Sequence, residues 1–119
     1  MGYRIDYHAS GAVLSAVVSG KSKYAARIAR DIGAQARERA ARQLLIDLRR
    51  LDGRVGSLRE LLTGRGGPAR AANRRIAVLD VVENDRYYVF AEMLARSLGC
   101  TLRHFADAPS AISWLSSKK

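Results

Sequence analysis

The sequence has too few of the residues that several kinds of site require. Only one of its 119 residues is a cysteine, Cys100, so the chain cannot form an internal disulfide. No second cysteine or nearby histidine gives the ligand spacing of a zinc site. No stretch approaches the roughly eighteen apolar residues of a membrane-spanning helix, and the opening residues lack the apolar block of a signal peptide. We therefore expect a cytoplasmic protein without a metal.

The motifs of common phosphate-binding and catalytic sites are also missing. The glycine-rich segment "GRGGPAR" lacks the lysine and hydroxyl of a P-loop, and no dinucleotide fingerprint follows the first predicted strand. No pattern places His8 or His104 beside Ser57 or Cys100, as a catalytic arrangement of serine or cysteine with histidine would require. We expect no cofactor and no catalytic residue.

Acidic residues are few, at 11 against 21 lysines and arginines, which gives a formal net charge of +10. Such a balance is typical of an arginine-rich proteome, or of a surface that attracts phosphates, nucleic acid, anionic lipid or an acidic partner. The basic residues are spread along the chain and do not interleave with aromatic residues, as they would in a strand-binding groove. We therefore do not expect a dedicated nucleic-acid site.

The apolar patterns that are present predict an α/β domain. Strands are predicted at 3–7, 12–20, 44–48, 74–82 and 101–106, and helices at 21–42, from near Ser57, at 83–99 and at 107–115. The first two strands read as an antiparallel hairpin, whereas 44–48 and 74–82 are apolar on both faces, as buried parallel strands are. The order β-β-α-β-α-β-α-β-α predicts one domain over 1–119, with a mixed, mostly parallel five-stranded sheet and about four helices.

Two of the predicted helices carry apolar residues that help to orient them. In the helix at 21–42, residues recur every four positions beside small alanines, at Tyr24, Ile28, Ile32 and Ala36. In the helix at 83–99, the apolar residues are Phe90, Met93, Leu94 and Leu98. The first pattern predicts an amphipathic helix with a stripe of small residues.

Two carboxylates, Asp47 and Asp80, are predicted near the ends of neighbouring strands, where open α/β sheets bind ligands. Two close carboxylates can share a proton or hold a metal ion, which would suit an enzyme. Each can instead accept hydrogen bonds from loop amides or pair with a nearby arginine. We favour this second interpretation and keep an enzyme that uses both carboxylates as an alternative.

Ser57 has two interpretations that share one geometry. The sequence "SLRE" is a capping box, in which the serine hydroxyl accepts from a backbone amide and Glu60 reaches back. A hydroxyl at a helix N-terminus also lies where free amides and the helix dipole favour a phosphate, and Arg50 and Arg54 can add charge-assisted bonds. Ser57 is therefore a candidate helix cap or phospho-acceptor.

Three parts of the chain resemble the STAS domain family, and within it the divergent SpoIIAA-like bacterial single-domain proteins. They are the opening "YRIDY…GAVLSAVVSG", the strand "LLIDLRRLDG" and the ending "FAEMLARSLGCTLRHFADAPSAISWL". The resemblance covers nearly the whole chain and implies a STAS/SpoIIAA-like fold. The wider family also resembles lipid-binding CRAL-TRIO domains, whose apolar pocket the alanine-rich first helix and "RYYVF" would line here.

The best-known members of this family are anti-sigma factor antagonists, which carry Asp-Ser-Ser-Gly after the third strand. A partner kinase phosphorylates the second serine of that motif. Counted from Asp47, Ser57 falls at this serine, but Val55 and Gly56 precede it and Leu58 replaces the glycine. The chain thus keeps the serine position without the surrounding motif.

The resemblance implies a non-enzymatic regulatory module that acts through a protein partner. The candidate interface comprises Arg49, Arg50, Asp52, Arg54, Asn84, Asp85, Arg86, Tyr87 and Tyr88. The alternatives are a carrier or sensor of a lipid or of a small anionic or apolar ligand, and a basic nucleic-acid-associated protein. A homodimer is left open.

The two interpretations of Ser57 predict different stabilities. If it is a cap, Ser57→Ala lowers the free energy of unfolding by about 0.5–2 kcal/mol. Ser57→Asp retains most of that stability, because aspartate also caps and its charge suits the helix dipole. Chemical denaturation of the three proteins measures both effects, and parental stability in Ser57→Ala would exclude the cap.

Overall fold

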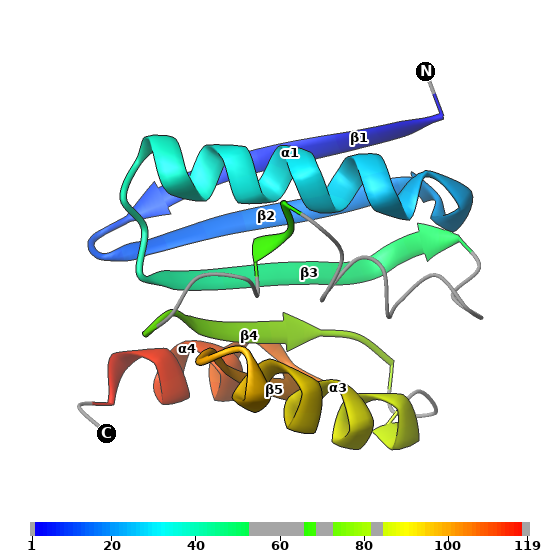
Figure 1. The fold of residues 1–119 in the computed structure, drawn as a ribbon. Coiled ribbons are helices and arrows are strands. Elements are labelled where there is room, and N and C mark those ends of the chain that lie inside the picture. The colour runs from blue at the N-terminus through cyan, green and yellow to red at the C-terminus, as the bar shows by residue number, and fades with distance from the viewer. Residues whose placement is uncertain (1, 53–65, 69–72, 82–84, 118–119) are drawn as a thin grey trace.

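The structure is a computed structural model that describes residues 2–52, 66–68, 73–81 and 85–117. Its strands are β1 (Tyr3–Ser10), β2 (Val13–Lys21), β3 (Gln43–Asp52), β4 (Arg75–Leu79) and β5 (Thr101–Phe105). They form one sheet in the order β1-β2-β3-β4-β5 (Figure 1). β1 and β2 are antiparallel and every later pair is parallel. The predicted mixed, mostly parallel five-stranded sheet is confirmed.

The helices of the described residues are η1 (Ser22–Tyr24), α1 (Ala25–Glu38), α3 (Asp85–Ser97) and α4 (Ala108–Ser116). The sequence predicts about four α-helices, and three are described; the helix predicted from near Ser57 lies outside the described residues. None of the described helices has the length and apolar character that a membrane span needs.

The helix α1 ends before the predicted boundary because the chain reverses at Ala40. This residue adopts the left-handed conformation, with φ 52°. The amide of Ala41 donates to the carbonyl of Ala36 at 2.8 Å, and that of Ala40 to Arg37 at 3.1 Å. This pattern is a Schellman motif, which satisfies the last carbonyls of a helix and redirects the chain, here into β3.

The two faces of the sheet are covered unequally. α1 and α3 pack on one face, where their side chains join those of all the parallel strands in the larger core cluster. α4 packs on the other face, where Ala111 and Leu115 contact Leu45, Ala77 and Leu79 (Figure 1). β3 and β4 are therefore buried on both faces, which explains why their sequences are continuously apolar.

The strand β3 is longer than the predicted segment 44–48, which is a correction to the sequence analysis. Its pairing with β2 shifts register between Val17 and Ser19, because Val17 pairs with Asp47 but Ser19 pairs with Arg50. One extra residue of β3 forms a bulge there. β2 continues to Lys21 and so supplies a partner strand up to Asp52, while Leu51 stays buried.

Arg74 is a buried cation just before β4 that the sequence analysis missed. Its guanidinium donates to the carbonyl of Ala41 at 3.0 Å and to that of Pro68 at 2.9 Å. Burial lowers the pKa of Arg74 from its ordinary value. The side chain links the segments that enter β3 and β4, since backbone carbonyls satisfy its donors.

Burial on both faces of the central strands predicts where the fold is sensitive. Ile46 is fully buried in β3, so Ile46→Ala is expected to lower the free energy of unfolding by about 2–5 kcal/mol. Ile112 in α4 is 51% exposed, and Ile112→Ala is the matched control, with an expected change within about 0.5 kcal/mol. Equal losses in urea denaturation would contradict the layer assignment.

Candidate functional site

The face of the sheet opposite α1 carries a polar hollow over β1, β2 and β3. Its volume is about 680 Å³, and it is lined by Asp6, Tyr7, His8, Val17, Asp47, Arg49 and Arg50. The register of the strands places Asp6 beside Val17 and Val17 beside Asp47. Two carboxylates therefore lie on either side of one apolar residue, with arginines on their flanks.

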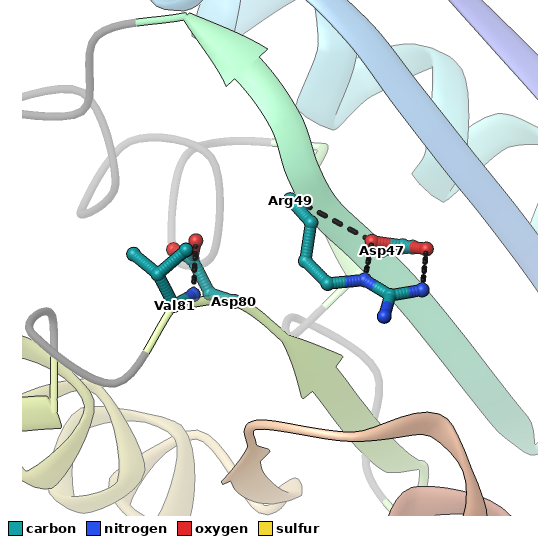
Figure 2. Close-up of polar contacts among 4 residues, drawn as sticks. All are labelled: Asp47, Arg49, Asp80 and Val81. Atoms are coloured by element: carbon teal, nitrogen blue, oxygen red, sulfur yellow. Dashed lines mark hydrogen bonds and ion pairs between the residues drawn. The ribbon is translucent and has the colours of Figure 1, made fainter.

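Asp47 is held by its neighbour on the same strand, Arg49. The Nε and a terminal nitrogen of Arg49 donate to the two carboxylate oxygens at 3.0 and 2.8 Å, and its backbone amide donates at 3.1 Å (Figure 2). Partial burial raises the pKa of Asp47, but these hydrogen bonds and the nearby charge outweigh it, so the pKa lies below its ordinary value. A two-pronged arginine–carboxylate pair fixes both side chains in one geometry.

A second arginine–aspartate pair, with a single hydrogen bond, lies along β1. Arg4 Nε donates to Asp6 Oδ1 at 3.0 Å, and both side chains are exposed. Exposed ion pairs contribute little to stability, about 0–1 kcal/mol. The hollow therefore presents fixed charges of both signs rather than an apolar pocket.

Asp80 follows β4 and is fully buried. Its Oδ1 accepts from the amide of Val81 at 2.8 Å (Figure 2), and its Oδ2 accepts from the hydroxyl of Tyr88 at 2.7 Å. The ring of His104 stacks on Tyr88 with centroids 4.2 Å apart, and its Nε2 lies 3.2 Å from the carbonyl oxygen of Asp80. These contacts join α3 to β4 and β5.

The two carboxylates do not form a pair. Asp47 lies two residues after Leu45 on β3 and so points to the same face as Leu45, whose side chain packs against α4. Asp80 instead accepts from Tyr88, which belongs to the cluster under α3. They therefore lie on opposite faces of the sheet. The alternative of an enzyme that uses Asp47 and Asp80 together is wrong in its geometry, and each carboxylate instead has the local partners that we favoured.

The predicted interface residues fall into different places. Arg49 and Arg50 line the hollow, and Asp52 is exposed at the end of β3. Tyr88 is 1% exposed, so the structure corrects its assignment to a surface: its hydroxyl donates to the buried Asp80. Outside the described residues lie Arg54, Ser57 and Asn84, together with the side chains of Asp85, Arg86 and Tyr87.

The helix α3 presents apolar residues to solvent that the sequence analysis did not assign to a site. Val89, Phe90 and Met93 are 61%, 53% and 63% exposed. They are adjacent on one helix face, because residues three and four apart are neighbours there. The side chains that α3 buries are those of Tyr88, Ala91 and Ala95. We call the three exposed residues the α3 apolar patch.

The alanine-rich stripe of α1 is part of the core in the described residues. Ala25, Ala29 and Ala36 are buried in the larger core cluster, where they pack against the sheet. Of the segment "RYYVF", Tyr88 is in that cluster while Val89 and Phe90 are exposed. The small side chains of α1 thus allow close packing of helix on sheet.

Comparison with known proteins identifies the fold. No protein-family model and no curated protein matches the chain. A solved anti-sigma factor antagonist from Mycobacterium paratuberculosis is similar in structure, with TM-score 0.67 and 18% sequence identity over 97% of this chain and 95% of that one. An uncharacterised DUF3478-family protein with a SpoIIAA-like fold from Shewanella loihica PV-4 has TM-score 0.61 and 18% identity, over 96% and 94%. The chain has a SpoIIAA-like fold, as the resemblance to the STAS domain family implies.

The pairing of Asp47 with Arg49 predicts a specific titration. Arg49→Leu is expected to raise the pKa of Asp47, because burial remains while the hydrogen bonds are lost. Arg50→Leu is the control, and we expect a smaller rise because Arg50 acts on Asp47 only through its charge. Carboxyl-carbon NMR during a pH titration measures both.

The same pair predicts how stability changes with pH. The pKa of Asp47 is lower in the folded than in the unfolded chain, so the pair stabilises the fold above the ordinary aspartate pKa of about 3.9. That stabilisation is lost as the pH falls through the folded pKa, and Arg49→Leu should remove it. An unchanged pKa of Asp47 in that variant would contradict the assignment.

Proposed function

We propose that this chain is a regulatory binding module and that a protein partner docks on the α3 apolar patch. The observation that carries the proposal is the exposure of Val89, Phe90 and Met93 on one face of α3. Aromatic residues and methionine are enriched at the centres of protein interfaces and carry much of their binding energy. Their removal from water would stabilise a complex.

The charge of the chain suggests the chemistry of that partner. With a formal net charge of +10, the chain attracts an acidic protein from solution more strongly than a basic one. Apolar contacts at the patch would then supply affinity, while the surrounding charge would speed association. We therefore expect a partner whose docking surface is apolar at its centre and acidic around it.

The fold supports a function of this kind by analogy. One structural neighbour is named an anti-sigma factor antagonist, so at least one protein of this fold is described as acting on a regulatory protein. Fold similarity at this identity does not name the partner. The patch on α3 is what makes a protein, rather than a nucleic acid or a small molecule, the partner that we propose.

The other predicted interface residues fit a second contact in the same module. Arg49, Arg50 and Asp52 lie at the end of β3, and α3 follows β4, the strand next to it. Ser57 stays a candidate cap or phospho-acceptor between these two elements in the chain. A phosphate there would change the charge that a partner meets by about −1.5 to −2.

Substitution of the patch tests the proposal. Phe90→Asp and Met93→Asp are expected to leave stability nearly unchanged, because both positions are exposed. Each should weaken partner binding by about 30-fold if the residue contributes about 2 kcal/mol. Ile112→Asp in α4 is the matched control, since Ile112 is equally apolar and 51% exposed on the other side of the sheet.

The readout is quantitative capture from cell extract with each variant immobilised, followed by titration of the captured protein. The proposal requires an acidic protein that the parent and Ile112→Asp retain and that both α3 variants lose. If all four proteins retain the same set, or if the Ile112 variant alone loses the partner, the α3 apolar patch is not the docking surface.

A further inference from the structure

Within the part of the chain that the structure describes, the strand β1 has a free edge along its whole length. It pairs with β2 through eight consecutive residues, from Tyr3 to Ser10, without a register shift. β1 lies at the end of the strand order, and no described segment pairs with its outer side (Figure 1). A long, regular edge strand offers a row of backbone donors and acceptors to another strand.

The hydrogen-bond pattern of the hairpin determines which residues of β1 direct their backbone N–H and C=O groups at the free edge. The amide of Lys21 donates to the carbonyl of Gly2 at 3.0 Å, so Gly2 belongs to a hydrogen-bonded pair with β2. These pairs alternate with non-hydrogen-bonded pairs in an antiparallel ladder. Arg4, Asp6 and His8 therefore direct their backbone groups at β2, while Tyr3, Ile5 and Tyr7 direct theirs at the free edge.

We propose that β1 pairs with β1 of a second copy of this chain, antiparallel and centred on Ile5. The segment "YRIDY" is complementary to itself in that register. Tyr3 of one copy lies opposite Tyr7 of the other, and Arg4 lies opposite Asp6. The hydrogen-bonded pairs are those of Tyr3, Ile5 and Tyr7, which are the residues with free backbone groups.

The charged side chains favour this register over its neighbours. Arg4 and Asp6 occupy non-hydrogen-bonded positions in the proposed pairing, where opposite side chains approach most closely. Both are exposed in the single chain and can therefore reach a second copy. An antiparallel register with its two-fold axis at Tyr7 instead places Asp6 opposite His8. Arg4 then has no acidic residue opposite it in the other copy.

The opposite edge of the sheet does not offer the same complementarity. β5 has five residues, and Arg103 is at its centre. Antiparallel pairing of two β5 strands about that centre places Arg103 opposite its own copy, and like charges in this position are destabilising. The structure thus distinguishes the two edges, and β1 is the one that fits a second copy.

Charge reversal across the pairing tests the proposal. The parent chain should show a concentration-dependent dimer in sedimentation velocity and light scattering. Arg4→Asp places like charges at both symmetric contacts and should weaken the dimer by about tenfold or more. Adding Asp6→Arg to it restores opposite charges and should restore the dimer. Arg96→Asp, an equal charge change at an exposed residue of α3, should have no effect.

A cysteine at the centre of the strand tests the register. Ile5→Cys places two thiols directly opposite each other, at a Cα separation of about 5.5 Å that suits a disulfide. Mild oxidation should cross-link this variant but not Arg96→Cys in α3, and the native Cys100 is buried. A monomeric parent at all concentrations overturns the proposal. A dimer that ignores Arg4→Asp, or that Ile5→Cys does not cross-link, overturns it as well.

Discussion

The burial of β3 and β4 on both faces is the constraint on which the rest of the structure depends. Two helices cover one face of the sheet and α4 covers part of the other, so only the centre of the sheet is enclosed on both sides. α1 packs on one face of the hairpin of β1 and β2, and on the other face Val13 of β2 packs against the cluster under α4. The polar hollow follows from this unequal cover, because a helix across that part of the second face would fill it. The free edge of β1 follows instead from its place at the end of the strand order.

The two aspartates show how position in the same sheet changes the use of a carboxylate. Asp47 lies on the less covered face and is held by Arg49, a cation that remains in contact with solvent. Asp80 lies under α3, where a backbone amide and the Tyr88 hydroxyl donate to it. The first arrangement presents charge to the surface, while the second fixes α3 on the sheet. α3 is in turn the helix that exposes Val89, Phe90 and Met93.

The sequence predicts the five strands, and apolar runs such as "LLIDL" indicate which of them are buried on both faces. It does not predict the end of β3, since the extra residues Arg49 to Asp52 depend on a bulge and on pairing with β2. The sequence also misplaces Tyr88. A tyrosine hydroxyl can face solvent or donate to a buried carboxylate, and the sequence does not show that Asp80 lies within reach. Phe90 and Met93 are exposed because α3 packs on the sheet through another face, which buries Tyr88, Ala91 and Ala95.

The doubly covered strands β3 and β4 form the stable centre of the fold, whereas β1 pairs with β2 on one side and with no described segment on the other. Residue-resolved amide hydrogen exchange measures this difference, since protection reports the free energy of opening at each residue. We expect the slowest exchange at residues 44–48 of β3 and 76–79 of β4. We also expect faster exchange at the outward amides of Ile5 and Tyr7 than at Asp6 in the dilute protein. Exchange in β3 or β4 as fast as that in β1 would show that cover on both faces does not make these strands the stable centre.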